Sequence, residues 1–277
     1  MQRWQIGDVT ITKVVELEAL GGMSFILPQA QPEAVRHLEW LKPHFMDEHG
    51  RLRASVHAFV VETPDRRIVV DTCIGNDKDR MPMKNWHRLQ TRFLEDLAAA
   101  GVPRESVDTV LCTHLHVDHV GWNTMLEGEQ WVPTFGRARY LVAESEFAYW
   151  RDQEEDEMNR QVFADSVAPV ADAGLLDLVA PTHRLCEEVE LVPTHGHTPG
   201  HVSVRIRSRG EEALITGDFL HHPCQLAHPE WAAAVDFDPV ASTETRRRVF
   251  EACADTPTLV LGTHFAGVTG GRIVRDG

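Results

Sequence analysis

The spacing of apolar and polar residues along the chain predicts an α/β protein. Val9 to Leu17 alternates β-branched or apolar residues with polar ones, which is the period of a half-buried strand. Apolar runs at 55–62 and 67–71 flank a Thr-Pro-Asp-Arg turn and predict a hairpin. Residues 86–100 have helical spacing and end at a Gly-Val-Pro stop.

The rest of the chain continues this alternation in two similar halves. Further strands are predicted at 107–112, 139–142, 175–179, 183–186, 189–193, 201–207, 213–216 and 259–261, and helices at 144–150, 156–168 and 239–255. Several strands in each half end in His or Asp. The pattern argues for two sheets packed face to face with helices outside. No stretch resembles a linker, so we expect one domain over residues 1–277.

Residues 22–50 form an extension with a helix predicted at 32–41 and a stop at Pro43. The extension is rich in apolar side chains for a loop: Phe25, Ile26, Leu27, Trp40 and Phe45. These side chains either pack on the core or a subunit interface, which would make a homodimer, or form the apolar wall of a substrate pocket. A polar, Met-containing loop at 75–85 is the second candidate for a pocket roof.

The densest chemical signal is the pattern H-x-H-x-D-H formed by His114, His116, Asp118 and His119. An apolar strand enters this run, and side chains at i and i+2 of a strand share a face. Neutral imidazole and carboxylate are ligands for zinc and similar divalent ions. A solvated loop that is rich in His by chance is the alternative, but it leaves the apolar strand before the run unexplained.

Two later segments carry the same kinds of side chain. His197 lies in Thr194-His195-Gly196-His197-Thr198-Pro199-Gly200-His201, a tight turn whose Gly and Pro residues let the backbone approach a small object closely. Asp218 ends a predicted strand, the position where α/β sites gather. His264 follows the last predicted strand.

Composition narrows the classes of partner. The chain has 27 Lys and Arg against 42 Asp and Glu, a formal net charge of −15, which disfavours a nucleic-acid partner. No apolar run is long enough to cross a membrane, and no secretory signal is visible, which favours the cytoplasm. The five Cys contain no C-x-x-C pair and are expected to be buried thiols; Cys224 is not expected to be a ligand.

Taken together, these motifs resemble those of the metallo-β-lactamase-fold hydrolases, and most of all the branch of N-acyl homoserine lactonases and methyl parathion hydrolase. The resemblance covers nearly the whole chain and implies a four-layer αβ/βα sandwich. It assigns His114, His116 and His197 to one metal. It assigns Asp118, His119 and His264 to a second metal, with Asp218 bridging the two. Asp71 would orient a ligand, although a turn-capping role is an equal alternative.

Seven ligands are too many for one tetrahedral zinc but suit two divalent ions, with zinc expected first and manganese, iron or cobalt as alternatives. Such a pair supplies a bridging hydroxide as nucleophile. We therefore expect a hydrolase that cleaves a small neutral lactone or ester. An aryl ester or an organophosphate triester is the alternative substrate, and a di-iron redox protein is the alternative of another class. The Gly-x-Ser-x-Gly motif of serine hydrolases is absent.

Asp118, Asp218 and His221 are the residues expected to take part in the chemistry. His221 lies three residues after Asp218, where several lactonase relatives carry a Tyr. Its imidazole could donate a hydrogen bond to the oxyanion or protonate the leaving group; a surface His pair is the alternative. The sequence leaves the roles of His195, His201 and His222 open.

Overall fold

The computed structural model describes residues 1–153 and 156–275 and divides the chain into two units. The first unit contains Met1–Glu16 and Val56–Pro181, and the second contains Leu17–Ser55 and Thr182–Gly277. Each unit is therefore assembled from two separate stretches of sequence. The single domain expected from the sequence stays a prediction.

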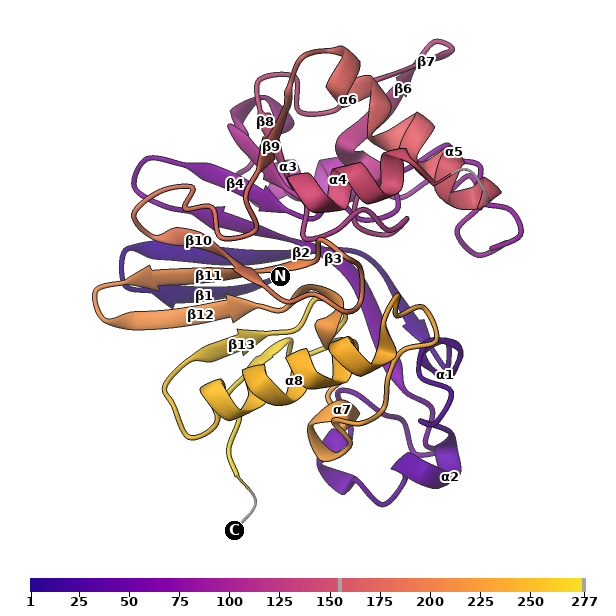
Figure 1. Ribbon diagram of the computed structural model, residues 1–277, viewed down its shortest axis with the longest axis vertical. Coiled ribbons are helices and arrows are strands. Elements are labelled where there is room, and N and C mark those ends of the chain that lie inside the picture. The colour runs from indigo at the N-terminus through magenta and orange to yellow at the C-terminus, as the bar shows by residue number, and fades with distance from the viewer. Residues whose placement is uncertain (154–155, 276–277) are drawn as a thin grey trace. The chain divides into compact units, whose positions relative to one another are not determined.

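The first unit is built on a seven-stranded sheet with the hydrogen-bonded order β1-β2-β3-β4-β5-β8-β9 (Figure 1). Its strands are β1 Gln2–Ile6, β2 Val9–Leu20, β3 Arg53–Glu62, β4 Arg67–Val70, β5 Thr109–Leu111, β8 Arg139–Ala143 and β9 Leu176–Val179. The end of β2 and the start of β3 belong to the second unit. Strands β4, β5, β8 and β9 run parallel, whereas β1 with β2 and β3 with β4 are antiparallel.

The parallel part of this sheet carries the chain to the first group of candidate ligands. Strand β4 contributes Ile68, Val69 and Val70, and β5 contributes Val110 and Leu111, all buried. Continuous apolar runs of this kind form where both faces of a parallel sheet are covered. Both strands consequently end inside the protein, and polar side chains that follow them are buried as well.

Helices and a small hairpin complete the first unit. The helices are α3 Phe93–Ala99, η2 Arg104–Ser106, η3 Gly121–Asn123, α4 Glu144–Arg151, α5 Glu157–Ser166 and α6 Ala168–Asp172, and α4 packs beside β8 and β9. Strands β6 Thr124–Glu127 and β7 Gln130–Pro133 pair as a hairpin. Sequence analysis predicted no strand in this segment or at β1.

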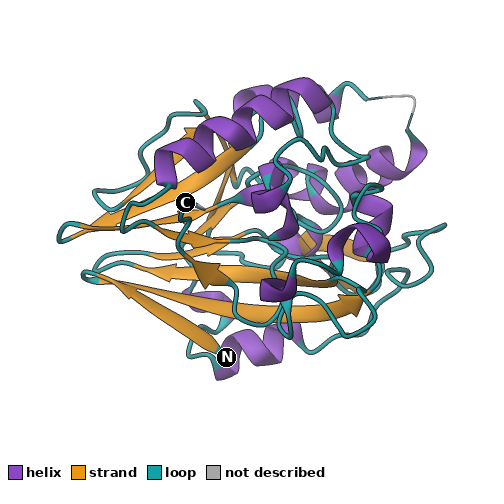
Figure 2. Cartoon of the chain, turned by 90° about the horizontal axis from the view of Figure 1, so that it is seen from below, coloured by secondary structure: helices purple, strands orange, loops and turns teal. Residues whose placement is uncertain are grey.

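The second unit holds a five-stranded sheet with the order β10-β11-β12-β13-β14. Its strands are β10 Val189–Pro193, β11 Val202–Ser208, β12 Glu211–Ile215, β13 Leu259–Leu261 and β14 Gly270–Gly271, and its helices are α1 Met23–Ile26, α2 Pro32–Val35, η1 Glu39–Leu41, η4 Gly217–Phe219, α7 Cys224–Ala227 and α8 Pro239–Cys253. Only β12 and β13 are parallel neighbours. Figure 2 shows the strands as orange arrows, with teal loops leading from their ends to the purple helices.

Helix α8 forms as predicted and has clear local causes. Asp238 caps its N-terminus by accepting hydrogen bonds from Val240 N and Ala241 N, both at 3.0 Å, and Pro239 occupies the first turn. Val249, Phe250 and Cys253 of α8 share a buried apolar cluster with Leu214 of β12 and Val260 of β13. The helix therefore covers one face of the sheet of the second unit.

Three predicted elements are wrong in part. The helix predicted at 32–41 is two short pieces, α2 and η1, because Leu38 leaves the helical backbone. The helix predicted at 86–100 begins only at Phe93, because side-chain and backbone hydrogen bonds between Asn76 and Thr91 hold the preceding residues in a loop. The strand predicted at 183–186 is a single bridge between Arg184 and Glu190.

The extension at 22–50 folds mainly onto its own small core. Its buried residues Met23, Leu27, Ala30, Val35, Leu38, Leu41 and Met46 cluster with Leu52, Cys224 and Ala233. Ile26 and Phe45 pack against this cluster, whereas the side chains of Phe25 and Trp40 are exposed. Core packing therefore accounts for most of its apolar side chains and leaves two for other contacts.

The loop predicted at 75–85 is also anchored. Lys78 and Arg80 are fully buried, and both pair with Asp165 at the end of α5.

Among the described residues, no helix has the length and apolar character needed to span a membrane. The five Cys are free thiols, four of them buried and Cys186 partly so.

Candidate metal centre

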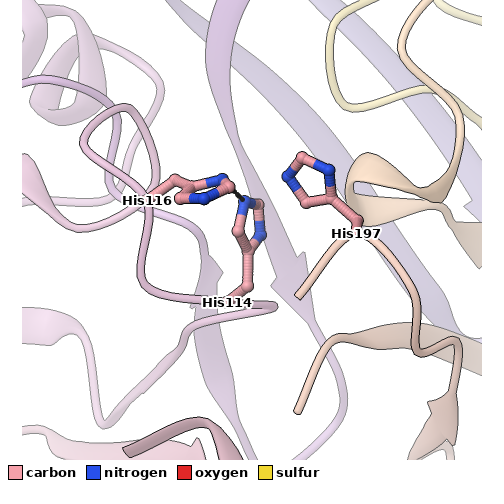
Figure 3. Close-up of side chains that lie close together, drawn as sticks. All are labelled: His114, His116 and His197. Carbon is pink, nitrogen blue, oxygen red and sulfur yellow. Dashed lines mark hydrogen bonds between the residues drawn. The ribbon is translucent and has the colours of Figure 1, made fainter. Parts of the chain in front are cut away.

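In the first unit, the loop after β5 brings four candidate ligands together: His114, His116, Asp118 and His119. His114 Nε2 lies 3.0 Å from His116 Nδ1, a contact drawn as a dashed line in Figure 3. The rings of His114 and His119 are 3.9 Å apart between centroids, and His119 Nε2 lies 3.6 Å from Asp118 Oδ1. We call these four residues the first ligand group.

Asp71 fixes the orientation of this group from the end of β4. Its Oδ2 is 2.9 Å from His119 Nδ1, and its Oδ1 accepts a hydrogen bond from Thr113 N at 2.8 Å. The carboxylate accepts the Nδ1 proton of His119, so the lone pair of this imidazole is on Nε2, the nitrogen beside Asp118. Asp71 thus has the orienting geometry that the resemblance implies, and it also holds the chain at Thr113.

Thr113 sets the tautomer of His114 in the same way. Its hydroxyl donates its only proton to Asp71 Oδ2 at 2.9 Å, so Oγ1 can accept the Nδ1 proton of His114 at 3.0 Å. His114 therefore also presents an Nε2 lone pair. Metal-ligating histidines in proteins have this arrangement: one ring nitrogen donates its proton to an oxygen acceptor, and the other binds the metal.

Close backbone packing restricts the loop that carries these residues. A Cβ atom on Gly121 would lie 1.8 Å from Ile74 O, and one on Gly75 would lie 2.7 Å from Gly121 C. Gly75 also has φ +83°. The loop after β4 and the loop after β5 can approach this closely only with glycine at both positions.

In the second unit, His197 lies in the turn after β10 and is oriented by Asp236. Asp236 Oδ1 is 2.8 Å from His197 Nδ1, and Asp236 Oδ2 accepts a hydrogen bond from Ala233 N at 2.9 Å. Burial alone would raise the pKa of Asp236, but the hydrogen bond with His197 and the nearby imidazoles hold it below its usual value. Sequence analysis missed Asp236, because one Asp in an irregular segment gives no signal of a partner 39 residues away.

Asp218 is the centre of the second ligand group, which we define as His197, Asp218, His221 and His264. Its Oδ2 lies 3.1 Å from His264 Nε2, 3.4 Å from His221 Nε2 and 3.7 Å from His197 Nε2. His264 Nδ1 is 3.0 Å from Ser55 O, so its proton is on Nδ1 and its Nε2 faces Asp218 with a lone pair.

His201 holds the backbone at Asp218, which gives this residue a positioning role. Its Nε2 accepts the N–H of Asp218 at 2.7 Å, and its Nδ1 is 3.0 Å from Thr194 O. Gly217 has φ +59°, and a Cβ there would lie 2.5 Å from His201 Nε2. The contact between His201 and the Asp218 turn therefore requires glycine at position 217.

His221 is buried in this group and is not a surface residue. Within the described part of the chain, neither of its ring nitrogens makes a hydrogen bond. Burial lowers the pKa of His221 to about 3, so its imidazole is neutral at neutral pH. Ligand atoms of His197, Asp218 and His221 lie within 4.8 Å of one another, a spacing that could hold a metal ion.

His222, Cys224 and His195 lie near the second ligand group in sequence but have contacts of other kinds. His222 Nε2 is 3.0 Å from Phe45 O, and its Nδ1 accepts the N–H of Cys224 at 3.1 Å. Burial raises the pKa of the Cys224 thiol to about 12, which disfavours the thiolate that a metal would need. His195 is half-buried, and its backbone carbonyl accepts a hydrogen bond from the Thr245 hydroxyl at 2.8 Å.

The donor atoms fit divalent metal ions in both groups. The ligand-type side chains are imidazoles and carboxylates. Four imidazoles have Nδ1 beside an oxygen and Nε2 left to bind a metal: His114, His119, His197 and His264. Nitrogen and oxygen donors of this kind suit zinc, manganese, iron and cobalt.

Comparison with known proteins gives the family of this chain. The family model described as the metallo-beta-lactamase superfamily matches residues 51–264. No protein with a curated description is a match.

Solved structures are similar over nearly the whole chain. The crystal structure of a hydrolase named AbOPH, described as in the beta lactamase superfamily, is 25% identical with a TM-score of 0.81, over 99% of this chain and 93% of that one. AidC, described as a dizinc quorum-quenching lactonase in complex with a product, is 17% identical with a TM-score of 0.82, over 99% and 94% of the two chains. A probable metal-dependent hydrolase from Staphylococcus aureus is 20% identical with a TM-score of 0.76, over 99% of both chains.

The fold expected from the sequence is confirmed by these similarities, and the resemblance to lactonases has a counterpart among the solved structures. The family model spans the first ligand group and continues through His197 and Asp218 to His264. The chain therefore belongs to the metallo-β-lactamase superfamily.

Proposed function

We propose that this metal-dependent hydrolase cleaves a lactone or carboxylic ester at a centre of two divalent ions, with zinc as the preferred metal. The observation that carries the proposal is the pair of ligand groups, each with imidazoles fixed to present Nε2 and each with a carboxylate beside them. Membership of the superfamily supports the same conclusion.

We assign the ligands as the resemblance implies. His114, His116 and His197 would hold one ion, Asp118, His119 and His264 would hold the other, and Asp218 would serve both. Asp71, Asp236, Thr113 and the carbonyl of Ser55 orient the imidazoles by accepting their Nδ1 protons. When bound, the ions would supply a hydroxide nucleophile near neutral pH and polarise the bond under attack.

The residues of the chain contribute to the reaction beyond binding metal. The carboxylate of Asp218 would carry a proton toward the leaving oxygen. The neutral imidazole of His221 would donate a hydrogen bond to the oxygen that becomes negative during attack. Its low pKa disfavours the alternative in which a protonated His221 is the general acid, because few molecules carry the extra proton at neutral pH.

The net charge and the similar solved structures support the substrate class that we propose. A net charge of −15 disfavours polyanionic substrates, and AidC, a lactonase by its description, is similar in fold. A small neutral molecule with a cleavable carbonyl group fits both observations, and we place it before an organophosphate triester.

A hydrolysis panel on zinc-loaded protein tests the proposal. The panel holds an N-acyl lactone, an aryl carboxylic ester and a dialkyl aryl phosphate, with Asp218→Ala as the matched inactive variant. We expect kcat/KM to be highest for the lactone or the carboxylic ester, and the variant to lose most of that activity with every substrate. Hydrolysis of the phosphotriester alone would contradict the substrate class, and no hydrolysis by zinc or manganese protein would overturn the function.

A further inference from the structure

Helix α4 places a buried carboxylate against the first ligand group. Glu146 is fully buried, and its Oε1 accepts the backbone N–H of Leu115 at 3.0 Å. Leu115 lies between His114 and His116, so this hydrogen bond holds the stretch of backbone that carries both imidazoles.

The same carboxylate oxygen binds a second side chain on the same face of the helix. Trp150 Nε1 donates to Glu146 Oε1 at 2.6 Å, four residues along α4. The indole of Trp150 lies 5.2 Å from the ring of His116 between centroids, at an interplanar angle of 70°. Helix α4 therefore contacts the backbone at Leu115, next to His116, and also the ring of His116.

The contacts that orient His116 differ from those that orient the other candidate ligands. His114, His119, His197 and His264 each have Nδ1 fixed by an oxygen. His116 instead presents Nδ1 toward His114 Nε2 at 3.0 Å, and its ring packs on an indole that Glu146 holds in place.

We propose that Glu146 and Trp150 are positioning residues that hold His116 in its metal-binding orientation, and so set the affinity of one of the two metals. The inference rests on the proposed function, since it needs His116 to be a ligand. Burying a carboxylate is costly unless hydrogen bonds and a nearby cation compensate it. The hydrogen bonds from Leu115 N and Trp150 Nε1 are present here, and a dication at His116 would supply the charge.

The test compares four variants with the wild-type protein. Glu146→Ala removes the acceptor, Glu146→Gln keeps an oxygen at Oε1, and Trp150→Leu removes the ring packed on His116. Glu144→Ala is the control, because Glu144 is an exposed carboxylate on the same helix. Each protein is titrated with zinc against a chelator, its cobalt form is measured by visible absorption, and its metal-free form is melted to check folding.

We expect Glu146→Ala to bind one of its two zinc ions 10- to 100-fold more weakly, with an altered cobalt spectrum. Glu146→Gln should stay within about threefold of wild type, because the geometry is restored. Trp150→Leu should bind that ion several-fold more weakly. If Glu146→Ala does not fold, the zinc affinity of Trp150→Leu decides the test.

Equal zinc affinities and cobalt spectra in Glu146→Ala, Trp150→Leu and Glu144→Ala would overturn the proposal. An equal loss of affinity in the Gln variant would also overturn it, because positioning by the oxygen would then be irrelevant. A wild-type protein that binds no metal would overturn the proposed function instead, so the two failures are distinguishable.

Discussion

At the scale of single residues, His221 and His222 are neighbours with opposite surroundings. Both are buried, and burial lowers the pKa of both, to about 3 for His221 and about 4 for His222. His222 has both nitrogens occupied by backbone groups, whereas His221 has neither in a hydrogen bond among the described residues. An imidazole buried without hydrogen-bond partners costs stability, so we infer that its partner is substrate or metal.

Replacing His221 by Phe should lower kcat roughly ten- to a thousandfold with metal content unchanged, because the hydrogen bond to the developing negative charge is lost. The measurement is steady-state kinetics of metal-loaded protein on esters with leaving groups of different pKa. A donor to the oxyanion affects all leaving groups alike.

Two results would contradict that role. An unchanged kcat across the series would remove His221 from the chemistry. Loss of a metal ion from the variant would make His221 a ligand, as its spacing with His197 and Asp218 also permits.

Replacing His222 by Leu should reduce the pH dependence of stability. The pKa of His222 is about 4 in the folded state and about 6.5 in the unfolded state, so only the unfolded chain takes up this proton between these values. The free energy of unfolding therefore falls as pH falls through this window, by about 3 kcal/mol for this residue.

Urea unfolding of metal-free protein at pH 7.5 and pH 4.5 measures the effect. His222→Leu should be less stable at pH 7.5, because Cys224 N loses its acceptor, yet lose less stability than wild type on acidification. Equal losses in the two proteins would mean that His222 is protonated in the folded state.

At the scale of elements, the extension at 22–50 shows how short segments are stabilised. Helices α1 and α2 have four residues each, far below the length at which an isolated helix is stable. Buried side chains such as Leu27 and Val35 hold these pieces on a shared apolar cluster. The apolar spacing at 32–41 therefore reflects the burial of two consecutive short helices, α2 and η1, and not of one continuous helix.

Substitutions of Leu27 and Phe25 in the extension test core packing and substrate contact separately. Leu27 is fully buried, whereas Phe25 is 83% exposed. Leu27→Ala should destabilise the protein by about 2–5 kcal/mol, because it opens a cavity. Phe25→Ser should leave stability within about 0.5 kcal/mol and raise KM for long-chain substrates more than for short ones, since we predict that Phe25 lines the apolar pocket.

Denaturant unfolding and a chain-length series of esters check both effects. An equal change of KM for long and short substrates would assign Phe25 to another contact, such as a subunit interface. Leu27→Ala with normal stability would contradict the packing described for the extension.

At the scale of the whole molecule, the fold could be predicted because its signals are local. The apolar runs of β4 and β5 and the cap and apolar face of α8 need no distant partner to be recognised. The seven candidate ligands were predicted from local motifs together with the family resemblance, since each follows a predicted strand or lies in a Gly-rich turn.

Long-range partners could not be predicted. Asp236 orients His197 across 39 residues, and Glu146 binds Leu115 N across 31. Neither residue belongs to a motif, and only the folded chain brings it to its partner. The hairpin β6–β7 was missed for a related reason: its strands are short and its outward residues are polar or exposed.

The proposed function requires two divalent ions per chain, and metal stoichiometry is its sharpest test. Metal-free protein is reconstituted with excess zinc or manganese, freed of unbound metal and measured by elemental analysis against protein concentration. We expect two ions per chain in the wild-type protein and fewer in Asp218→Ala. One ion or fewer per chain in the wild-type protein would contradict the proposed function.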